Sequence, residues 1–141
     1  MSEKRICSIF VPYKTKDGAI LVFLNKRANT AQRLPGYFGF FGGGREGDED
    51  PDQTLRREVK EELNIVPDGY QFLGRYEFER SIKDVFYLGV DDDFEKGIAI
   101  LEGDGGRYFN EVEVSNEQKL IEEDKTILRD LFAILHQEKH V

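Results

Sequence analysis

Three glutamates, Glu58, Glu61 and Glu62, lie close together in a charged segment of the chain. If this segment is helical, Glu58 and Glu62 are one turn apart and repel each other, at a cost of about 0.2–0.5 kcal/mol on an exposed helix. Hard divalent cations prefer carboxylate oxygens and would relieve this repulsion. The spacing therefore indicates a metal site, while the alternative is a solvated acidic helix face of a common kind.

A helix that begins after Asp50 and runs to about residue 63 is expected to carry these glutamates. Asp50 before Pro51 is a typical helix start, and Gln53 can complete a capping box with Asp50. At about 100° per residue, the three glutamates share one arc beside an apolar stripe. The stripe is predicted to be the buried face and comprises Leu55, Val59 and Leu63.

Glycines 42–44 and two charged residues frame this helix. The glycines let the backbone approach other groups closely and offer carbonyl oxygens to a cation. Arg57 lies four residues before Glu61, which is the spacing of an ion pair on one helix face. The glycine run, Glu49 and the helix start at fixed distances favour a metal site over a solvated helix face.

These residues match a known motif, the Nudix box, which reads G-x5-E-x7-R-E-U-x-E-E-x-G-U with U aliphatic. Its positions are filled here by Gly43, Glu49, Arg57, Glu58, Val59, Glu61, Glu62 and Ile65. The chain therefore resembles the Nudix hydrolases, which hydrolyse nucleoside diphosphates linked to another moiety. Asn64 departs from the box, where the family has the glycine that ends the helix. Asparagine is the next most tolerant residue of a left-handed conformation, so we expect the fold to survive.

The resemblance implies an α/β architecture, the Nudix fold, with a mixed β-sheet sandwiched between α-helices. It also implies two or three Mg²⁺ ions around a substrate diphosphate, with Mn²⁺ as a substitute. MutT-type members carry a further ligand in a Glu-Gly segment before an aromatic strand, which Glu102 matches, and Glu111 and Glu113 are the alternatives. The implied ligands are the Gly42 carbonyl, Glu58, Glu61, Glu62 and Glu102.

The resemblance also assigns roles in catalysis. By its position in the motif, Glu58 is the first choice for the general base, and a carboxylate from another loop is the alternative. Arg57 is expected to orient the carboxylates through ion pairs. Gly43, Glu49 and Asn64 receive structural roles, with Glu49 bracing the loop rather than binding metal.

Three further residues are candidates for substrate binding. Arg27 and Arg33 lie in a polar stretch, and either one alone would be interpreted as a solvated arginine. Nudix nucleotide hydrolases often have a phosphate-binding arginine at the place of Arg27, and guanidinium suits phosphate. For Arg33, a solvated arginine and a substrate-binding one stay equal alternatives. Tyr108, like Tyr37 and Phe78, is able to stack on a base or to belong to the core.

The motif leaves the substrate open. The short chain and the Glu102 segment favour a nucleoside triphosphate, cleaved to monophosphate and pyrophosphate. Arg80 and Ser81 stand where the ADP-ribose subgroup carries a proline, which counts against that subgroup. The alternatives are nucleotide sugars, dinucleoside polyphosphates, or a non-catalytic nucleotide-sensing module, although such modules usually have a broken box.

Composition limits the remaining classes. The chain of 141 residues is expected to form a single Nudix domain over residues 1–141, as a monomer or homodimer. Its net charge of −8 argues against a nucleic-acid partner and favours a small nucleotide substrate. Cys7 is the lone cysteine, which excludes a disulfide framework and favours a buried thiol. No segment looks long enough to span a membrane and no signal peptide is evident, so the cytoplasm is expected.

The other elements are predicted from hydrophobic patterning. Strands are expected over residues 6–13, 19–24, 37–41, 70–79 and 82–90. Residues 91–97 are expected to form a solvated loop, because the EF-hand spacing of a calcium site is absent.

A last helix is predicted near the end of the chain. The residues 115–118 show a capping-box pattern that predicts a helix start. The stripe expected to pack on the sheet comprises Ile127, Leu128, Leu131, Phe132 and Leu135. His136 and His140 are expected to be solvated rather than metal-bound.

Overall fold

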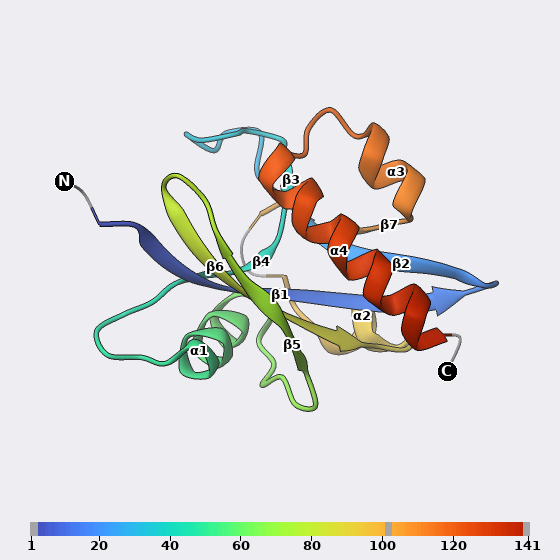
Figure 1. Cartoon of the computed structure of the whole chain (residues 1–141), viewed down its shortest axis with the longest axis horizontal. Coiled ribbons are helices and arrows are strands. Elements are labelled where there is room, and N and C mark those ends of the chain that lie inside the picture. Colours follow the sequence, from blue (N-terminus) through green and yellow to red (C-terminus); the bar gives the residue numbers. More distant parts are fainter. Residues whose placement is uncertain (1–2, 101–102, 140–141) are drawn as a thin grey trace.

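Strand β1 (Arg5–Lys16) runs through the middle of a mixed sheet in the computed structural model, which describes residues 3–100 and 103–139. The strands that complete the sheet are β2 (Ala19–Lys26), β3 (Phe38–Gly39), β4 (Phe41–Gly44), β5 (Gln71–Glu77), β6 (Ser81–Gly89) and β7 (Gly106–Phe109). The helices are α1 (Pro51–Leu63), α2 (Phe94–Gly97), α3 (Glu111–Asn116) and α4 (Glu122–Lys139). Figure 1 shows their arrangement. The expected α/β class with a mixed sheet is confirmed.

Strands β1 and β2 diverge, and the glycine segment lies in the fork between them. The two strands pair with each other only over residues 13–16 and 19–22. Strand β3 pairs with the end of β2, and β4 pairs antiparallel with residues 7–10 of β1. On its other side β1 pairs in parallel with β6, which in turn pairs with the edge strand β5. The fork therefore holds the glycines in the plane of the sheet.

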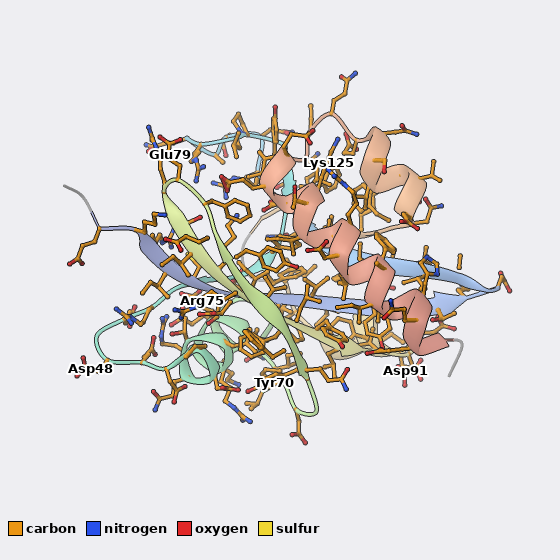
Figure 2. The ribbon with its side chains drawn as sticks, in the orientation of Figure 1. Asp48, Tyr70, Arg75, Glu79, Asp91 and Lys125 are labelled. Atoms are coloured by element: carbon orange, nitrogen blue, oxygen red, sulfur yellow. The ribbon has the colours of Figure 1, made fainter. Side chains whose placement is uncertain are left out.

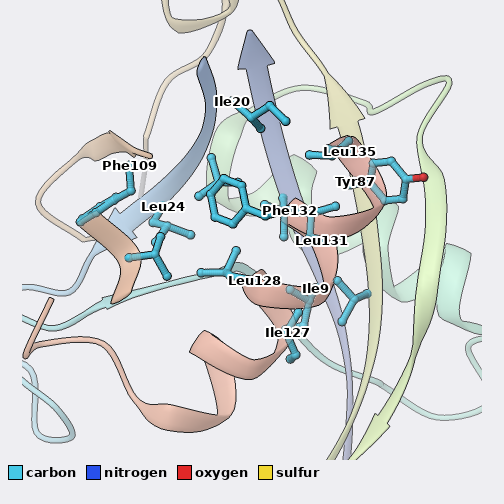
Figure 3. Close-up of a cluster of buried hydrophobic side chains, with 14 of the residues drawn as sticks. Ile9, Ile20, Leu24, Tyr87, Phe109, Ile127, Leu128, Leu131, Phe132 and Leu135 are labelled. Carbon is cyan, nitrogen blue, oxygen red and sulfur yellow. The ribbon is translucent and has the colours of Figure 1, made fainter. Parts of the chain in front are cut away.

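The two faces of the sheet bury separate hydrophobic clusters, because alternate residues of a strand point to opposite sides. Helix α4 covers one face, where Ile9 and Leu24 meet its apolar stripe (Figure 3). The predicted stripe of α4 is confirmed, since all its members are buried: Ile127, Leu128, Leu131, Phe132 and Leu135. Helix α1 covers the other face, where Phe10, Phe41 and Phe86 pack together. Cys7 is buried, as expected.

The structure corrects two predictions. Residues 115–118 do not begin the last helix: Ser115 and Asn116 end α3, and α4 begins at Glu122. The reason is a stronger capping box upstream, in which Asn110 and Glu113 bond each other's backbone N–H groups. Residues 94–97, which were expected to belong to a solvated loop, form the short helix α2.

No helix in residues 3–100 and 103–139 is long and apolar enough to cross a membrane. The single-domain organisation and the cytoplasmic location stay predictions.

Candidate active site

Helix α1 has both ends that the sequence predicts. Asp50 accepts from the Gln53 backbone N–H at 2.8 Å, and the Gln53 side chain accepts from the Asp50 N–H at 2.9 Å. At the other end Asn64 adopts the left-handed conformation, with φ 57° and ψ 35°, and donates its N–H to the Lys60 carbonyl. Asparagine therefore ends the helix in the conformation expected of the family's glycine.

The glutamates of α1 lie at graded depths beside its buried stripe. Leu55, Val59 and Leu63 are fully buried, which confirms the predicted face. Glu62 is 5% exposed, whereas the side chains of Glu58 and Glu61 are 17% and 54% exposed. The exposure of the carboxylates thus increases from Glu62 through Glu58 to Glu61.

The glycine strand contacts the two deeper carboxylates. The Gly42 N–H donates to Glu62 Oε1 at 2.8 Å. Gly43 lies against Glu58, because a Cβ on Gly43 would be 2.5 Å from the Glu58 carboxyl carbon. Gly42 has a φ of +122°, and a Cβ there would collide with the Ser8 carbonyl oxygen. Only glycine at these positions lets α1 present Glu58 and Glu62 so close to the backbone of β4.

Replacing Gly43 with alanine tests this packing. The new methyl group must displace the Glu58 carboxylate, which is the end of a flexible side chain, so the fold should tolerate Gly43→Ala. We expect a loss of turnover of at least about tenfold from a misplaced carboxylate, with a change in unfolding free energy below about 1 kcal/mol. Gly97→Ala is the matched control, because nothing lies within 4 Å of the added Cβ. Equal turnover in the two variants would contradict the packing argument.

Arg57 joins the carboxylates to the glycine strand. Its Nε donates to Glu49 Oε2 at 2.8 Å, and its Nη1 donates to Glu58 Oε1 at 3.0 Å. Its Nη2 donates to the Gly44 carbonyl at 2.8 Å, and Glu61 is 3.5 Å from Nη1. Hydrogen bonding to Glu49 is the main cause that raises the Arg57 pKa. These contacts are those of a residue that orients the carboxylates, as the motif implies.

Glu49 closes the loop before α1. Its carboxylate accepts from the Glu46 N–H at 2.9 Å and from the Thr54 hydroxyl at 3.1 Å, besides the bonds from Arg57. Hydrogen bonding from Arg57, followed by that from Glu46, lowers the Glu49 pKa from 4.5 to about 2. With its oxygens occupied in this way, Glu49 has the contacts of a bracing residue.

The low pKa of Glu49 predicts how stability changes with pH. A carboxyl whose pKa is lower in the folded state stabilises fully above its unfolded value, here 4.5, and loses that contribution as pH falls towards 2. We therefore expect the difference in Tm between wild type and Glu49→Gln to be constant above about pH 5 and to shrink between pH 4.5 and 2. Thermal unfolding at a series of pH values measures it. A difference that stays the same down to pH 2 would contradict the assignment.

The carboxylates are not gathered around a single point. In the described part of the chain, no group of three histidine, cysteine, aspartate or glutamate side chains is arranged to hold a metal ion. Glu102 lies outside the described residues. Glu62 is bound to Gly42 and Glu61 turns towards Arg57, so each has a partner other than a cation. The donor set is nevertheless all oxygen, which suits Mg²⁺ or Mn²⁺. The chemistry of these glutamates therefore fits a hard divalent cation.

The alternative ligands lie elsewhere. Glu113 caps α3 and lies 3.4 Å from Arg107, and Glu111 is 3.2 Å from the ring of His136. His136 is half-exposed, and His140 lies outside the described residues.

A cavity of about 1060 Å³ opens beside Gly42, Gly43 and Glu62. Its other walls are the segment after β2, the start of α4 and the tip of the β5–β6 hairpin, where Figure 2 labels Glu79. Both predicted arginines line it, and Arg27 Nε donates to the Arg33 carbonyl at 2.8 Å. Its apolar lining includes Ile9, Leu34, Phe38, Phe40 and Ile121.

Tyr108, predicted to contact substrate, does not line this cavity. Its ring packs on the α1 side of the sheet, 4.7 Å from the ring of Phe23, and Lys14 Nζ lies 4.1 Å from its centroid. Burial is the first cause that raises its pKa to about 12. Tyr37 and Phe78 are also absent from the lining.

Sequence reasoning missed a buried ion pair in the cavity wall. Lys83 Nζ lies 3.0 Å from Asp124 Oδ1 and 3.6 Å from Glu123 Oε1. Asp124 is buried, and burial raises its pKa against the opposing effect of Lys83. The two residues come from β6 and the first turn of α4, so only the fold brings them together. The local signal was a lysine next to an aspartate, Asp84, in a mostly apolar strand.

Comparisons with known proteins agree with this geometry. The family model described as NUDIX domain matches residues 4–131. The chain belongs to the NUDIX domain family. No curated protein matches the chain.

Solved structures share the fold at low sequence identity. The NUDIX domain of Shewanella oneidensis NrtR, solved with ADP ribose, has a TM-score of 0.74 at 16% identity, covering 96% of this chain and 90% of that one. MutT studied from Aliivibrio salmonicida and Vibrio cholerae gives 0.72 at 20% identity, covering 93% and 98%. A Caenorhabditis elegans Ap4A hydrolase gives 0.67 at 22% identity, covering 94% and 98%. The expected Nudix fold is confirmed.

Proposed function

We propose that the chain is a metal-dependent Nudix hydrolase that cleaves a nucleoside triphosphate to a monophosphate and pyrophosphate. One observation carries the proposal: Glu62 is bound to β4 at the wall of a large cavity that contains basic side chains, and Glu58 packs against Gly43 of the same strand. Carboxylates beside such a cavity suit a cation that bridges protein and phosphate.

We propose that two or three Mg²⁺ ions bind here and that the Gly42 carbonyl, Glu58, Glu61, Glu62 and Glu102 would hold them. When bound, the ions neutralise phosphate charge and acidify water. Glu58 accepts the proton of a water that attacks one phosphorus in line, which displaces the phosphate-bearing leaving group. Arg57 keeps Glu58 in place through its 3.0 Å bond, and Glu49 holds Arg57.

The cavity supports a nucleotide as the substrate. Its volume of about 1060 Å³ is at the upper end of the range typical of ligand pockets. Arg27 and Arg33 supply cationic donors for phosphate. The apolar lining offers a surface for a base, and the Lys83–Asp124 pair offers both a donor and an acceptor to its polar edge.

A second candidate is kept because structural similarity does not choose between substrates. The solved neighbours include a domain with ADP ribose, a MutT protein and an Ap4A hydrolase, all below 25% identity. Hydrolysis of nucleotide sugars or dinucleoside polyphosphates is therefore the alternative, followed by a non-catalytic sensing module. The unbroken set of carboxylates in the motif favours an enzyme over a sensor.

A turnover panel with Mg²⁺ decides between these functions. It holds canonical and oxidised nucleoside triphosphates, dinucleoside polyphosphates, ADP-ribose and nucleotide sugars, with products separated by chromatography. Monophosphate plus pyrophosphate from a triphosphate is the expected result. Nucleotide binding without turnover of any member would establish the sensing module instead.

We also propose a single domain with no nucleic-acid partner. The net charge of −8 supports the second point, because phosphate backbones bind basic surfaces. The cytoplasm is the proposed location, as a monomer or homodimer.

A further inference from the structure

Arginines flank the glycine segment from both sides of the fork. Arg27 directly follows β2, whose last residues pair with β3. Arg5 begins β1, whose next residues pair with β4. Because β3 and β4 lie between these strands, the backbone that contacts Glu58 and Glu62 has a cation on each side. The resemblance to Nudix nucleotide hydrolases gives Arg27 a role in phosphate binding and leaves Arg5 without a role.

The side chain of Arg5 lies directly over the glycine strand. A Cβ on Gly44 would be 2.8 Å from Arg5 Nε and 3.1 Å from Nη2. Gly44 is the neighbour of Gly43, against which the Glu58 carboxylate packs on the α1 side. Arg5 and Glu58 therefore lie on opposite faces of β4, since neighbouring residues of a strand point to opposite sides. Arg5 lines the cavity together with Gly42 and Glu62.

Arg5 is also available for a ligand. Its side chain forms no ion pair with any residue in the ranges 3–100 and 103–139, and the same is true of Arg80, whose carbonyl accepts from the Arg5 N–H at 3.2 Å. Lys83, by contrast, is already neutralised by Asp124 and Glu123. Glu79 lies next to Arg80 in the lining, so this end of the cavity is not uniformly basic.

We propose that Arg5 is a phosphate-binding residue that holds the pyrophosphate part of the substrate, on the side of β4 opposite Arg27. The inference rests on the proposed hydrolysis of a nucleoside triphosphate. A phosphate chain bound in the cavity along the glycines beside Glu62 would meet Arg27 at one end and Arg5, with Arg80 next to it, at the other. A guanidinium at this place gives a bidentate contact to phosphate oxygens.

Calorimetric titration with magnesium pyrophosphate tests the inference directly. We expect Arg5→Gln to weaken pyrophosphate binding by about tenfold or more, as is typical for the loss of charged hydrogen bonds. Binding of a nucleoside monophosphate should change by less than about twofold, because Arg27 and the rest of the cavity are intact. Arg5→Lys should keep part of the affinity, since lysine keeps the positive charge but cannot make the bidentate hydrogen bonds of a guanidinium. Arg129→Gln, an exposed arginine of α4 outside the cavity, is the matched control.

An unchanged pyrophosphate affinity in Arg5→Gln would overturn the inference, and so would an equal loss for the monophosphate or a wild-type chain that binds no pyrophosphate. Thermal unfolding of each variant shows that the fold is kept. The titration needs no turnover. A wild-type chain that hydrolyses no triphosphate therefore defeats the proposed function, whereas the comparison of affinities decides the role of Arg5.

Discussion

Glu58→Gln is expected to lower kcat by about 10²–10⁴-fold, the contribution typical of a general base. The substitution keeps the size of the side chain and its contact with Gly43, but glutamine cannot accept the proton from water. It also removes one negative charge beside Arg57, whose Nη1 lies 3.0 Å from Glu58. Steady-state kinetics with the best substrate of the turnover panel measures the effect.

The control for Glu58→Gln is Glu122→Gln, which removes an exposed carboxylate at the start of α4. Its kcat should stay within about twofold of wild type. If Glu58→Gln lowers kcat by less than about tenfold, a carboxylate from another loop takes the proton and the assignment of Glu58 is wrong.

Glu62→Gln is expected to separate metal binding from folding. Glutamine can still accept the Gly42 N–H, so the bond that fixes Glu62 to the glycine strand survives. Because the substitution removes a negative charge that binds the cation, Mg²⁺ affinity should fall by at least about 10–100-fold. A loss of this size is typical even when the mutated residue only hydrogen-bonds to a metal ligand. Without Mg²⁺, relief of the repulsion from Glu58 should leave the unfolding free energy unchanged or higher by about 0.2–0.5 kcal/mol.

Two measurements check Glu62→Gln: titration of Mg²⁺ against wild type and variant, and chemical unfolding in the presence of a chelator. A lower Mg²⁺ affinity together with an unchanged or higher stability would show that the charge of Glu62 serves metal binding and not folding. A variant that loses stability without Mg²⁺ while keeping its Mg²⁺ affinity would show that Glu62 serves packing alone.

Local rules were enough for helix α1. Asp50, Pro51 and Gln53 determine its start through neighbouring backbone groups, and Asn64 determines its end, so no distant contact is needed. The apolar stripe of α1 could be predicted as well, because its spacing follows from the geometry of a single helix. The orientation of Glu58 and Glu62 beside that stripe follows from this spacing.

Non-local features could not be read from the sequence. Glycines have no side-chain pattern, so the pairing of β4 with β1 leaves no trace in the residues 42–44 themselves. The contact of Lys83 with Asp124 joins residues 41 positions apart, and the position of Arg5 over Gly44 depends on the same sheet register. The position of Tyr108 outside the cavity could not be predicted either, because an aromatic residue in a strand gives the same sequence pattern on either face of the sheet.

The central place of β1 has a consequence for synthesis on the ribosome. This strand is made first, yet its parallel partner, Ser81–Gly89 of β6, emerges much later. Apolar residues such as Ile9 and Val11 stay without that neighbour until β6 has been synthesised. Contacts so distant in sequence form slowly, and an open strand edge invites association with other chains. We therefore expect nascent chains that stop before β6 to depend on chaperones, and full-length chains to be released from them.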